Sequence, residues 1–391
     1  MDGALAVLLP LTSRNMPRPA LEQLQAFAEC LPDASECVLF IGVDDDDPVF
    51  AHASMETFWA QAFPEYSKNG HIIVDHFAPT SPPAVCAIAR ALAQRALKFG
   101  PTQCTMLALL GDDVSISPKR DWLTSVRRGF KEINERLLVE NDLNVPVGFG
   151  VVCLPDSTFI GFPSFPIVGR PHFEAFDNLL SPVAFVNQDA DPFTYEVYRR
   201  FGAAIYAEGI SMVNGIGGDE GNNARYERVS VDWKDGLLEE GVACVSTYLS
   251  KKNTSKIVHA AHVTTLDVIV PSFRTPEALL RRIIALPTPK GFSTQFIIIV
   301  DCPEDGAEVR SRFEADFHER VRVRVNKENI GASCTRNRGL DESSAQWIVF
   351  LDDDIEPHPS LLLEYASAIA TKGATAAGFV GASYFPESGF Y

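Results

Sequence analysis

Short apolar runs alternate with amphipathic segments along the first part of the chain. The runs have the length of buried strands, and the segments between them carry apolar residues at helical spacing. This pattern predicts strands at Val7–Leu9, Val38–Ile41, Ile72–Val74, Met106–Leu110 and Val147–Val152, and helices at Pro83–Phe99 and Trp122–Leu138. Because strands and helices alternate, we expect an α/β fold: a mostly parallel sheet with helices on both faces.

The same pattern starts again after a polar stretch, Lys251–Lys256. Further strands are predicted at Leu266–Val270, Phe296–Val300, Val321–Val325 and Trp347–Leu351, and helices at Pro276–Ala285, Ser333–Ser343 and Ser360–Thr371. Small polar residues between two periodic regions are typical of a linker. The sequence therefore predicts one domain over residues 1–250, a linker over 251–264 and a second domain over 265–391.

Two features occur in the same order in both halves. Leu9–Arg14 (LPLTSR) resembles Val270–Arg274 (VPSFR), and each follows the first strand of its half. A later strand ends in acidic residues in each half, at Leu110–Val114 and at Leu351–Ile355. This repetition predicts an internal duplication of the fold.

The net charge of −17 over 391 residues narrows the expected partners. Nucleic acids and anionic membrane surfaces attract clustered Lys and Arg, so neither is expected as a partner. An acidic protein can still bind an anionic ligand through a metal ion, although acidic charge also serves solubility alone.

The eight cysteines are scattered without a CxxC pair, which argues against a zinc site and favours reduced thiols. The first residues lack the basic and apolar segments of a signal peptide. No uncharged apolar run reaches the length of a membrane span. From these features we expect a cytoplasmic protein.

Four polar features follow predicted strands of the second half, where an open parallel sheet binds its ligands. They are Pro271–Arg274, Asp301, Asn326–Gly339 and Asp352–Asp354. An Asp at a strand end can accept hydrogen bonds from a nucleobase, and the N-terminus of a helix after a tight turn attracts a diphosphate. Carboxylates at a strand end suit Mg²⁺ or Mn²⁺, which also bridge to phosphates. Solvated acidic loops are the alternative interpretation.

The order of these features resembles that of family 2 glycosyltransferases, which have the Rossmann-like GT-A fold. That family carries Pro-Thr/Ser after the first strand, Val-Asp-Asp after the second, Asn-x-Gly before an Arg-bearing helix, and Leu-Asp-x-Asp after a later strand. The resemblance covers about residues 266–385. It implies two GT-A-like domains in tandem, with mostly parallel sheets flanked by helices, the second ending before its acceptor half. Cys302 departs from the pattern, because the family has a second Asp there.

The resemblance also implies roles for residues of the second half. Asp301 would contact the base, Arg336 the diphosphate region, and Asp352 and Asp354 would form the DxD pair for ribose and metal. The full implied donor-binding set is Pro271, Arg274, Asp301, Asn329, Gly331, Arg336, Asp352 and Asp353, with Asp354 as the metal ligand.

The first half resembles the same family less closely but contains the whole order of parts. The implied donor-binding residues are Pro10, Arg14, Asp44, Arg90, Asp112 and Asp113, with Asp113 also a metal ligand. Asp189 stands at the position of the general base that takes the proton of the acceptor hydroxyl, and Gln188 replaces the Glu before it. Helix capping is the alternative for Asp189 and Asp191, and a solvated loop for Asp44–Asp47.

A glycine-rich loop follows in the first half, and the family often carries a His in it that completes the metal shell. Asn214 takes that place here, and Asp219 or Glu220 could supply the missing ligand.

The resemblance implies a metal-dependent glycosyltransferase of the hexosyltransferase type. Its donor would be a UDP- or GDP-sugar, its acceptor a hydroxyl of a glycan or another molecule, its metal Mn²⁺ or Mg²⁺, and its outcome inversion. A nucleotidyltransferase is one alternative, but neither half has the Gly-rich basic loop that such an enzyme usually needs. A non-catalytic nucleotide-sugar or carbohydrate-binding module is the other, which Gln188, Asn214 and Cys302 favour.

Overall fold

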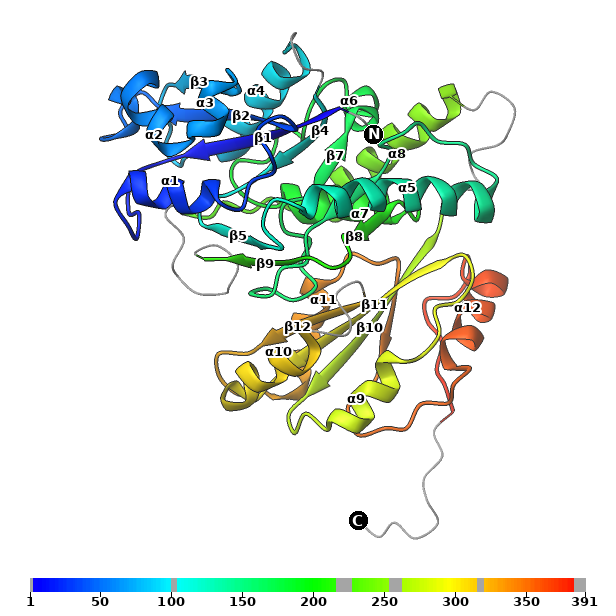
Figure 1. Cartoon of the computed structure of the whole chain (residues 1–391). Coiled ribbons are helices and arrows are strands. Elements are labelled where there is room, and N and C mark those ends of the chain that lie inside the picture. The colour runs from blue at the N-terminus through cyan, green and yellow to red at the C-terminus, as the bar shows by residue number, and fades with distance from the viewer. Residues whose placement is uncertain (1–2, 100–103, 216–226, 253–261, 315–319, 383–391) are drawn as a thin grey trace.

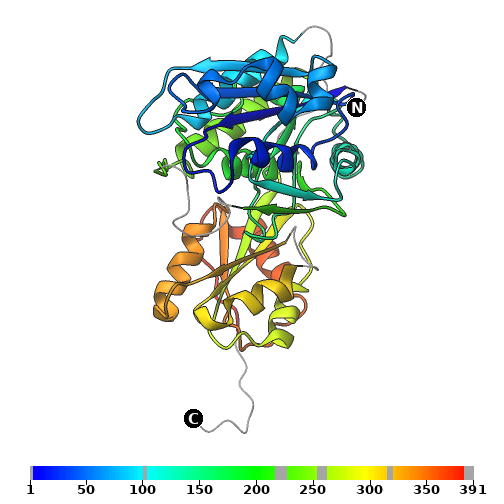
Figure 2. The ribbon, with the colours of Figure 1, turned by 60° about the vertical axis from the view of Figure 1, so that its left-hand side comes forward.

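The computed structural model describes residues 3–99, 104–215, 227–252, 262–314 and 320–382. It contains two separate, mostly parallel sheets, each packed with helices, and the units around them lie one above the other in Figures 1 and 2. The predicted α/β class is therefore confirmed. No helix in these residue ranges is long and apolar enough to cross a membrane.

The first sheet has seven strands in the order β3-β2-β1-β4-β7-β6-β8. They are β1 (Ala4–Leu11), β2 (Cys37–Asp44), β3 (Ile72–Phe77), β4 (Cys104–Leu109), β6 (Val151–Cys153), β7 (Ile167–Gly169) and β8 (Ala204–Tyr206). Strands β3, β2, β1 and β4 run parallel, and β7 pairs antiparallel with β4 and β6. Strands β1 and β2 are buried on both faces, as the centre of a parallel sheet requires.

Helices pack against this sheet (Figure 1). The helices that contact its strands are α4 (Val85–Leu97), α5 (Trp122–Asn141), α6 (Arg170–Ala175) and α7 (Ala190–Arg199). Helix α8 (Gly236–Lys252) packs on α6 and α7, and α1 (Ala20–Ala28) packs on the short α2 (Ala60–Ala62), which contacts α3 (Pro64–Lys68). A two-stranded antiparallel ribbon, β5 (Val114–Ser117) with β9 (Ser211–Asn214), lies on the side of the second half (Figure 1).

One predicted strand is largely wrong. The apolar stretch Val147–Val152 becomes extended only at Val151, the first residue of β6. Gly148 and Gly150 before it have φ angles of +84° and +105°. These left-handed residues bend the backbone away from a ladder, so the apolar side chains before them belong to a turn.

The second sheet has four parallel strands in the order β12-β11-β10-β13. They are β10 (Thr264–Ser272), β11 (Phe292–Val300), β12 (Val321–Val325) and β13 (Trp347–Phe350), and the helices are α9 (Glu277–Ile284), α10 (Gly306–Glu314), α11 (Gly331–Glu342) and α12 (Leu361–Lys372). This order matches β3-β2-β1-β4 of the first sheet strand by strand, which supports the predicted duplication of the fold.

Each sheet has its own apolar core. The larger core draws its residues from Leu5 to Leu249, and the smaller from Leu266 to Leu362. One residue breaks this division, because Ile160 of the first half is buried in the smaller core. Residues 253–261 of the predicted linker lie outside the described residues, so the domain division remains a prediction.

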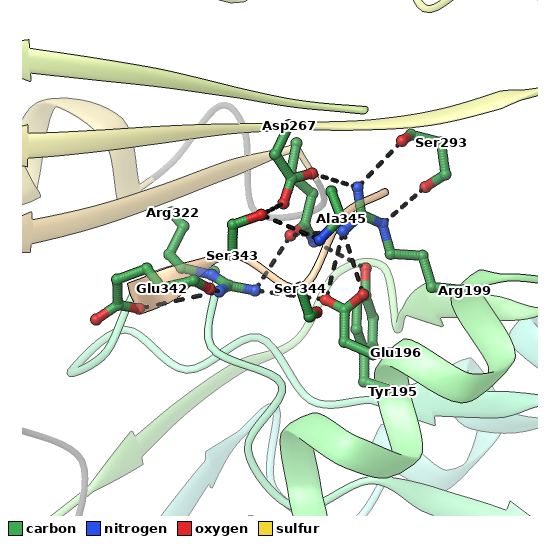
Figure 3. Close-up of polar contacts among 12 residues, drawn as sticks. Tyr195, Glu196, Arg199, Asp267, Ser293, Arg322, Glu342, Ser343, Ser344 and Ala345 are labelled. Carbon is green, nitrogen blue, oxygen red and sulfur yellow. Dashed lines mark hydrogen bonds and ion pairs between the residues drawn. The ribbon is translucent and has the colours of Figure 1, made fainter. Parts of the chain in front are cut away.

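Charged side chains from both halves meet in a buried cluster (Figure 3). Arg199 of α7 forms an ion pair with Asp267 of β10, with 2.5 Å between Nη2 and Oδ1, and also lies 3.3 Å from Glu196. Arg322 of β12 lies 3.8 Å from the same Glu196. Tyr195 accepts a hydrogen bond from Gln295 at 3.2 Å. Because buried charges need partners, this cluster fixes α7 against the second sheet.

Candidate functional site

A cavity of about 480 Å³ opens at the carboxyl ends of β1, β2 and β4. This is the edge where an open parallel sheet binds its ligands. Of the predicted site residues in the first half, the ones that line it are Pro10, Arg14, Asp44, Asp112, Asp113 and Asp189. We call this cavity the first pocket.

Asp47 and Asp44, in the acidic run at the end of β2, have different functions. Asp47 is 1% exposed and accepts hydrogen bonds from the Ser13 amide at 2.8 Å and from the Phe50 amide at 2.9 Å. Burial favours the protonated acid, but these donors and the Ser13 hydroxyl outweigh it and lower the pKa of Asp47. Asp47 therefore fixes the loop after β1, and the alternative of a solvated acidic loop is wrong for this residue.

Asp44, in contrast, lines the first pocket beside Arg14. The guanidinium of Arg14 lies 3.5 Å from the Asp44 carboxylate and 2.6 Å from that of Asp46. Burial raises the pKa of Asp44, and the positive charge of Arg14 opposes this. The pair gives the pocket both a cation and a carboxylate at the ends of β1 and β2.

Asp112 and Asp113 are fixed at the end of β4 by their backbones. The carbonyl of Asp112 accepts from the Gln23 side chain at 2.8 Å, and that of Asp113 from the Gly215 amide at 3.1 Å. Asp112 is 5% exposed, and Asp113 is half-buried. Asn214 lines the same pocket, whereas Asp219 and Glu220 lie outside the described residues.

Asp189 and Asp191 enter the first pocket from the start of α7. Asp189 has a φ of +72°, and its Oδ2 accepts from the Val231 amide at 2.8 Å. Oδ2 of Asp191 accepts from the Phe165 amide at 3.2 Å. Asp189 makes no side-chain cap of α7, so the capping alternative is wrong for it.

Both carboxyl groups hold a proton more readily than usual. Burial raises the pKa of Asp189, although hydrogen bonds from Val231, Trp233 and Ser230 oppose the shift. Burial raises the pKa of Asp191 to about 7, against the single amide of Phe165. Carboxyl groups in such an environment are suited to proton transfer near neutral pH.

Arg90 is not among the described residues that line the first pocket. Its Nη1 donates to the carbonyls of Pro182 at 3.0 Å and Phe185 at 3.3 Å. Burial lowers its pKa. The guanidinium thus anchors the segment before Asp189 rather than reaching a ligand.

A second cavity, of about 370 Å³, lies at the carboxyl ends of β10 and β11 and the start of α11. We call it the second pocket. The predicted residues that line it are Pro271, Asp301, Asn329, Gly331, Arg336, Asp352, Asp353 and Asp354. Arg274 is not among its described lining residues and is exposed.

Asp301 already has several internal donors. Its carboxylate accepts from the Asn326 side chain at 2.6 Å, the Ile330 amide at 3.0 Å and the Gly331 amide at 2.9 Å. Burial disfavours its charge, but these hydrogen bonds outweigh burial and lower the pKa of Asp301. The amides at the start of α11, expected to face a diphosphate, therefore donate to Asp301 instead.

The acids after β13 have separate partners. Arg336 forms an ion pair with Asp352, and the Ser272 hydroxyl donates to Asp353 at 2.6 Å. Asp354 is exposed at the mouth of the second pocket. Within the described ranges no group of three His, Cys, Asp or Glu residues could hold a metal. Mg²⁺ and Mn²⁺ commonly need only one or two carboxylates when phosphates and water complete the shell, so the exposed acids here fit such an ion.

The sequence interpretation missed the aromatic side of the first pocket. Phe159, Phe162 and Phe165 line it together with Ser164. The run of phenylalanines in FIGFPSF, residues 159–165, was the available signal, since pockets for organic ligands are rich in aromatic side chains.

Comparison with known proteins places the second half in a family. Residues 267–391 match the model of glycosyl transferase family 2. An uncharacterized glycosyltransferase of Escherichia coli (strain K12), YibD, is 28% identical over 96 residues, which are 25% of this chain and 28% of YibD. The putative teichuronic acid biosynthesis glycosyltransferase TuaG of Bacillus subtilis (strain 168) is 28% identical over 90 residues, 23% of this chain and 35% of TuaG. The chain thus spans about a third of the length of the curated relatives it matches.

Solved structures of glycosyltransferases are also similar to the chain. TarS of S. aureus (residues 1–349) in complex with UDP-GlcNAc is 12% identical with a TM-score of 0.38, over 63% of this chain and 71% of that one. The mannosyltransferase PcManGT from Pyrobaculum calidifontis, in complex with GDP-Man and Mn²⁺, is 12% identical with a TM-score of 0.36, over 66% and 77%. From the family match and its curated relatives, the C-terminal part of the chain, residues 267–391, belongs to glycosyl transferase family 2.

Proposed function

We propose that the protein transfers a glycosyl group from a nucleoside-diphosphate sugar to a hydroxyl acceptor. The observation that carries the proposal is the repeated arrangement of the two pockets. Four parallel strands have the same order in both sheets, and each pocket lies at the carboxyl ends of these strands. Each pocket is also lined by acids that follow a strand, Asp112 and Asp113 in the first half and Asp352 to Asp354 in the second. The family match of the second half gives this repeated arrangement a chemistry.

We assign the chemical step to the first pocket. Among the described residues, this pocket brings the acids that follow β4 and those at the start of α7 into one cavity. Asp189 would accept the proton of the acceptor hydroxyl while the oxygen attacks the anomeric carbon and the nucleoside diphosphate leaves, with inversion. Its raised pKa suits a base that works near neutral pH. Arg14 and Asp44 would hold the donor at the other side of the cavity.

A divalent cation, Mn²⁺ or Mg²⁺, would be held by Asp113 in the first pocket and by Asp354 in the second. Such an ion neutralises charge on the diphosphate as it leaves.

In the second pocket, Asp301 and Asp353 accept hydrogen bonds from the chain itself, and Asp352 forms an ion pair with Arg336. A nucleotide sugar there would displace Arg336 from Asp352. The described residues that line this pocket include no acid placed at the start of a helix as Asp189 is in the first, so this half suits binding without turnover. We therefore propose that it is a nucleotide-sugar-binding module.

Calorimetry and product analysis test these assignments. UDP-glucose and GDP-mannose would be titrated with Mn²⁺, and again with EDTA. Asp113→Ala should abolish transfer, and Asp354→Ala should weaken binding in the second pocket while transfer persists. Asp189→Asn should retain donor binding and lose transfer by about a hundredfold or more. Equal transfer by Asp189→Asn and the unchanged protein would refute the assigned base, and no donor binding in either pocket would refute the function.

A further inference from the structure

The loop between β6 and β7 contacts both the first pocket and the second half of the chain. We call residues 156–165 the aromatic loop. Its Phe159, Phe162, Ser164 and Phe165 line the first pocket, yet Ile160 between them is buried in the apolar core of the second half. The wall of one pocket is therefore seated on the other half of the chain.

Internal hydrogen bonds make this loop a closed unit. Asp156 is 1% exposed, and its Oδ1 accepts from the amides of Thr158 at 2.9 Å and Phe159 at 3.2 Å. Its Oδ2 accepts from the Ser164 hydroxyl at 2.7 Å. Because one buried carboxylate joins both ends of the loop, a shift at its tip moves the aromatic side chains together.

Arg324 of β12 makes polar contacts with that tip. Its Nη1 donates to the Ile160 carbonyl at 2.9 Å, and its guanidinium carbon lies 3.7 Å from the centre of the Phe159 ring. Its Nε donates to Glu342 of α11 at 3.0 Å. Planar guanidinium groups stack on aromatic rings in this way, and the attraction grows when water is excluded.

Placing a guanidinium here costs free energy. Arg324 is 0% exposed, and burial lowers its pKa to about 10, against the attraction of Glu342. An apolar side chain would pack against Ile160 without this desolvation cost. A flat cation, however, fixes both the position and the tilt of the Phe159 ring, which an aliphatic chain would not.

We infer that Arg324, in the second half, is a positioning residue of the first pocket, where it holds Phe159 as the wall on which a sugar ring of the bound ligand packs. The inference rests on the proposed function only for the identity of that ligand. A sugar ring has an apolar C–H face and an edge of hydroxyls. The aromatic loop offers apolar rings, and Asp189 and Asp191 offer hydrogen-bond acceptors in the same cavity.

The first test needs no ligand. Hydrogen exchange of the aromatic-loop amides would be compared in the unchanged protein, Arg324→Met and Arg324→Lys. Arg320→Met is the matched control, since Arg320 also stacks on a ring, Phe296 at 5.1 Å, and donates to a carbonyl, Leu286 at 2.7 Å. We expect exchange about tenfold faster in Arg324→Met, a smaller change in Arg324→Lys, and the original rate in Arg320→Met.

The second test measures binding of UDP-glucose and GDP-mannose with Mn²⁺. Arg324→Met and Phe159→Ala should weaken the same binding event by a similar factor, about tenfold, because the first frees the Phe159 ring and the second removes it. Phe159 does not line the second pocket, so this pair of variants assigns the event to the first. If the unchanged protein binds neither UDP-glucose nor GDP-mannose, the proposed function is refuted. Hydrogen exchange of the aromatic-loop amides still tests the role of Arg324 in that case. Unchanged loop exchange in Arg324→Met, or the same acceleration in Arg320→Met, would overturn the inference.

Discussion

Arg199 and Asp267 form an ion pair that is almost fully buried, with side chains 2% and 1% exposed, although they belong to different halves of the chain. Arg199 lies at the end of α7, and Asp189 immediately precedes the start of the same helix. The Ser343 hydroxyl gives Asp267 a further hydrogen bond at 2.6 Å. The helix that carries the acids of the first pocket is thus anchored on the second sheet at its other end.

Breaking this pair should destabilise the protein strongly. Arg199→Met leaves Asp267 buried without its cation, which costs about 3–5 kcal/mol for a pair of this kind. The measurement is the free energy of unfolding in urea. Arg120→Met is the control, because the Arg120–Glu65 pair is exposed and should contribute less than about 1 kcal/mol. A similar loss from both variants would contradict the importance of the buried cluster.

Asp47 should make stability depend on acid. Because its pKa is lower in the folded protein than in the unfolded chain, its contribution is complete above the unfolded pKa of about 4 and disappears as pH falls through the folded pKa. Asp47→Asn turns an amide group toward donors such as Ser13 and should cost about 2 kcal/mol at pH 7. Urea unfolding between pH 2 and pH 7 should show this difference shrinking at low pH.

Asp46 provides the comparison for that experiment. It pairs with Arg14 but is 56% exposed, so Asp46→Asn should cost less than about 1 kcal/mol at pH 7. Equal effects of the two substitutions would mean that Asp47 does not fix the loop after β1.

Much of this arrangement could be predicted from the sequence. The apolar runs at Val38–Ile41 and Phe296–Val300 are buried strands, and acids that follow strands line both pockets. The individual roles within an acidic run could not be predicted, because the donors that distinguish Asp47 from Asp44 include Ser13, which reaches Asp47 only in the folded protein. The charged cluster between the two halves could not be predicted either. Asp267 is a lone acid in an apolar strand, and it meets Arg199 only after both units fold.

Asp191 should give the opposite dependence on pH. Its folded pKa of about 7 lies above that of an unfolded Asp, so the folded protein holds this proton more tightly. Stability from this group is therefore present below about pH 4 and lost as pH rises toward 7. Asp191→Asn keeps an acceptor for the Phe165 amide, and its gain in stability over the unchanged protein should grow from about 1 kcal/mol at pH 5 to about 3 kcal/mol near pH 7. Parallel stability curves across that range would show that the carboxyl group is charged throughout.

Gly161, at the tip of the aromatic loop, should tolerate no side chain. It has a φ of +71°, and a Cβ atom there would lie 2.2 Å from the Val321 carbonyl of β12. Gly161→Ala would combine a left-handed backbone with a clash between the two halves. Gly209→Ala separates the two effects, because Gly209 has a φ of +70° and nothing within 4 Å of the added atom. The control should lose about 1 kcal/mol in urea unfolding from backbone strain. Gly161→Ala should lose on the order of 3 kcal/mol and accelerate exchange in residues 156–165, since the backbone of β12 cannot yield as a flexible side chain would. Equal losses in the free energy of unfolding would mean that Gly161 does not pack closely against the Val321 carbonyl of β12.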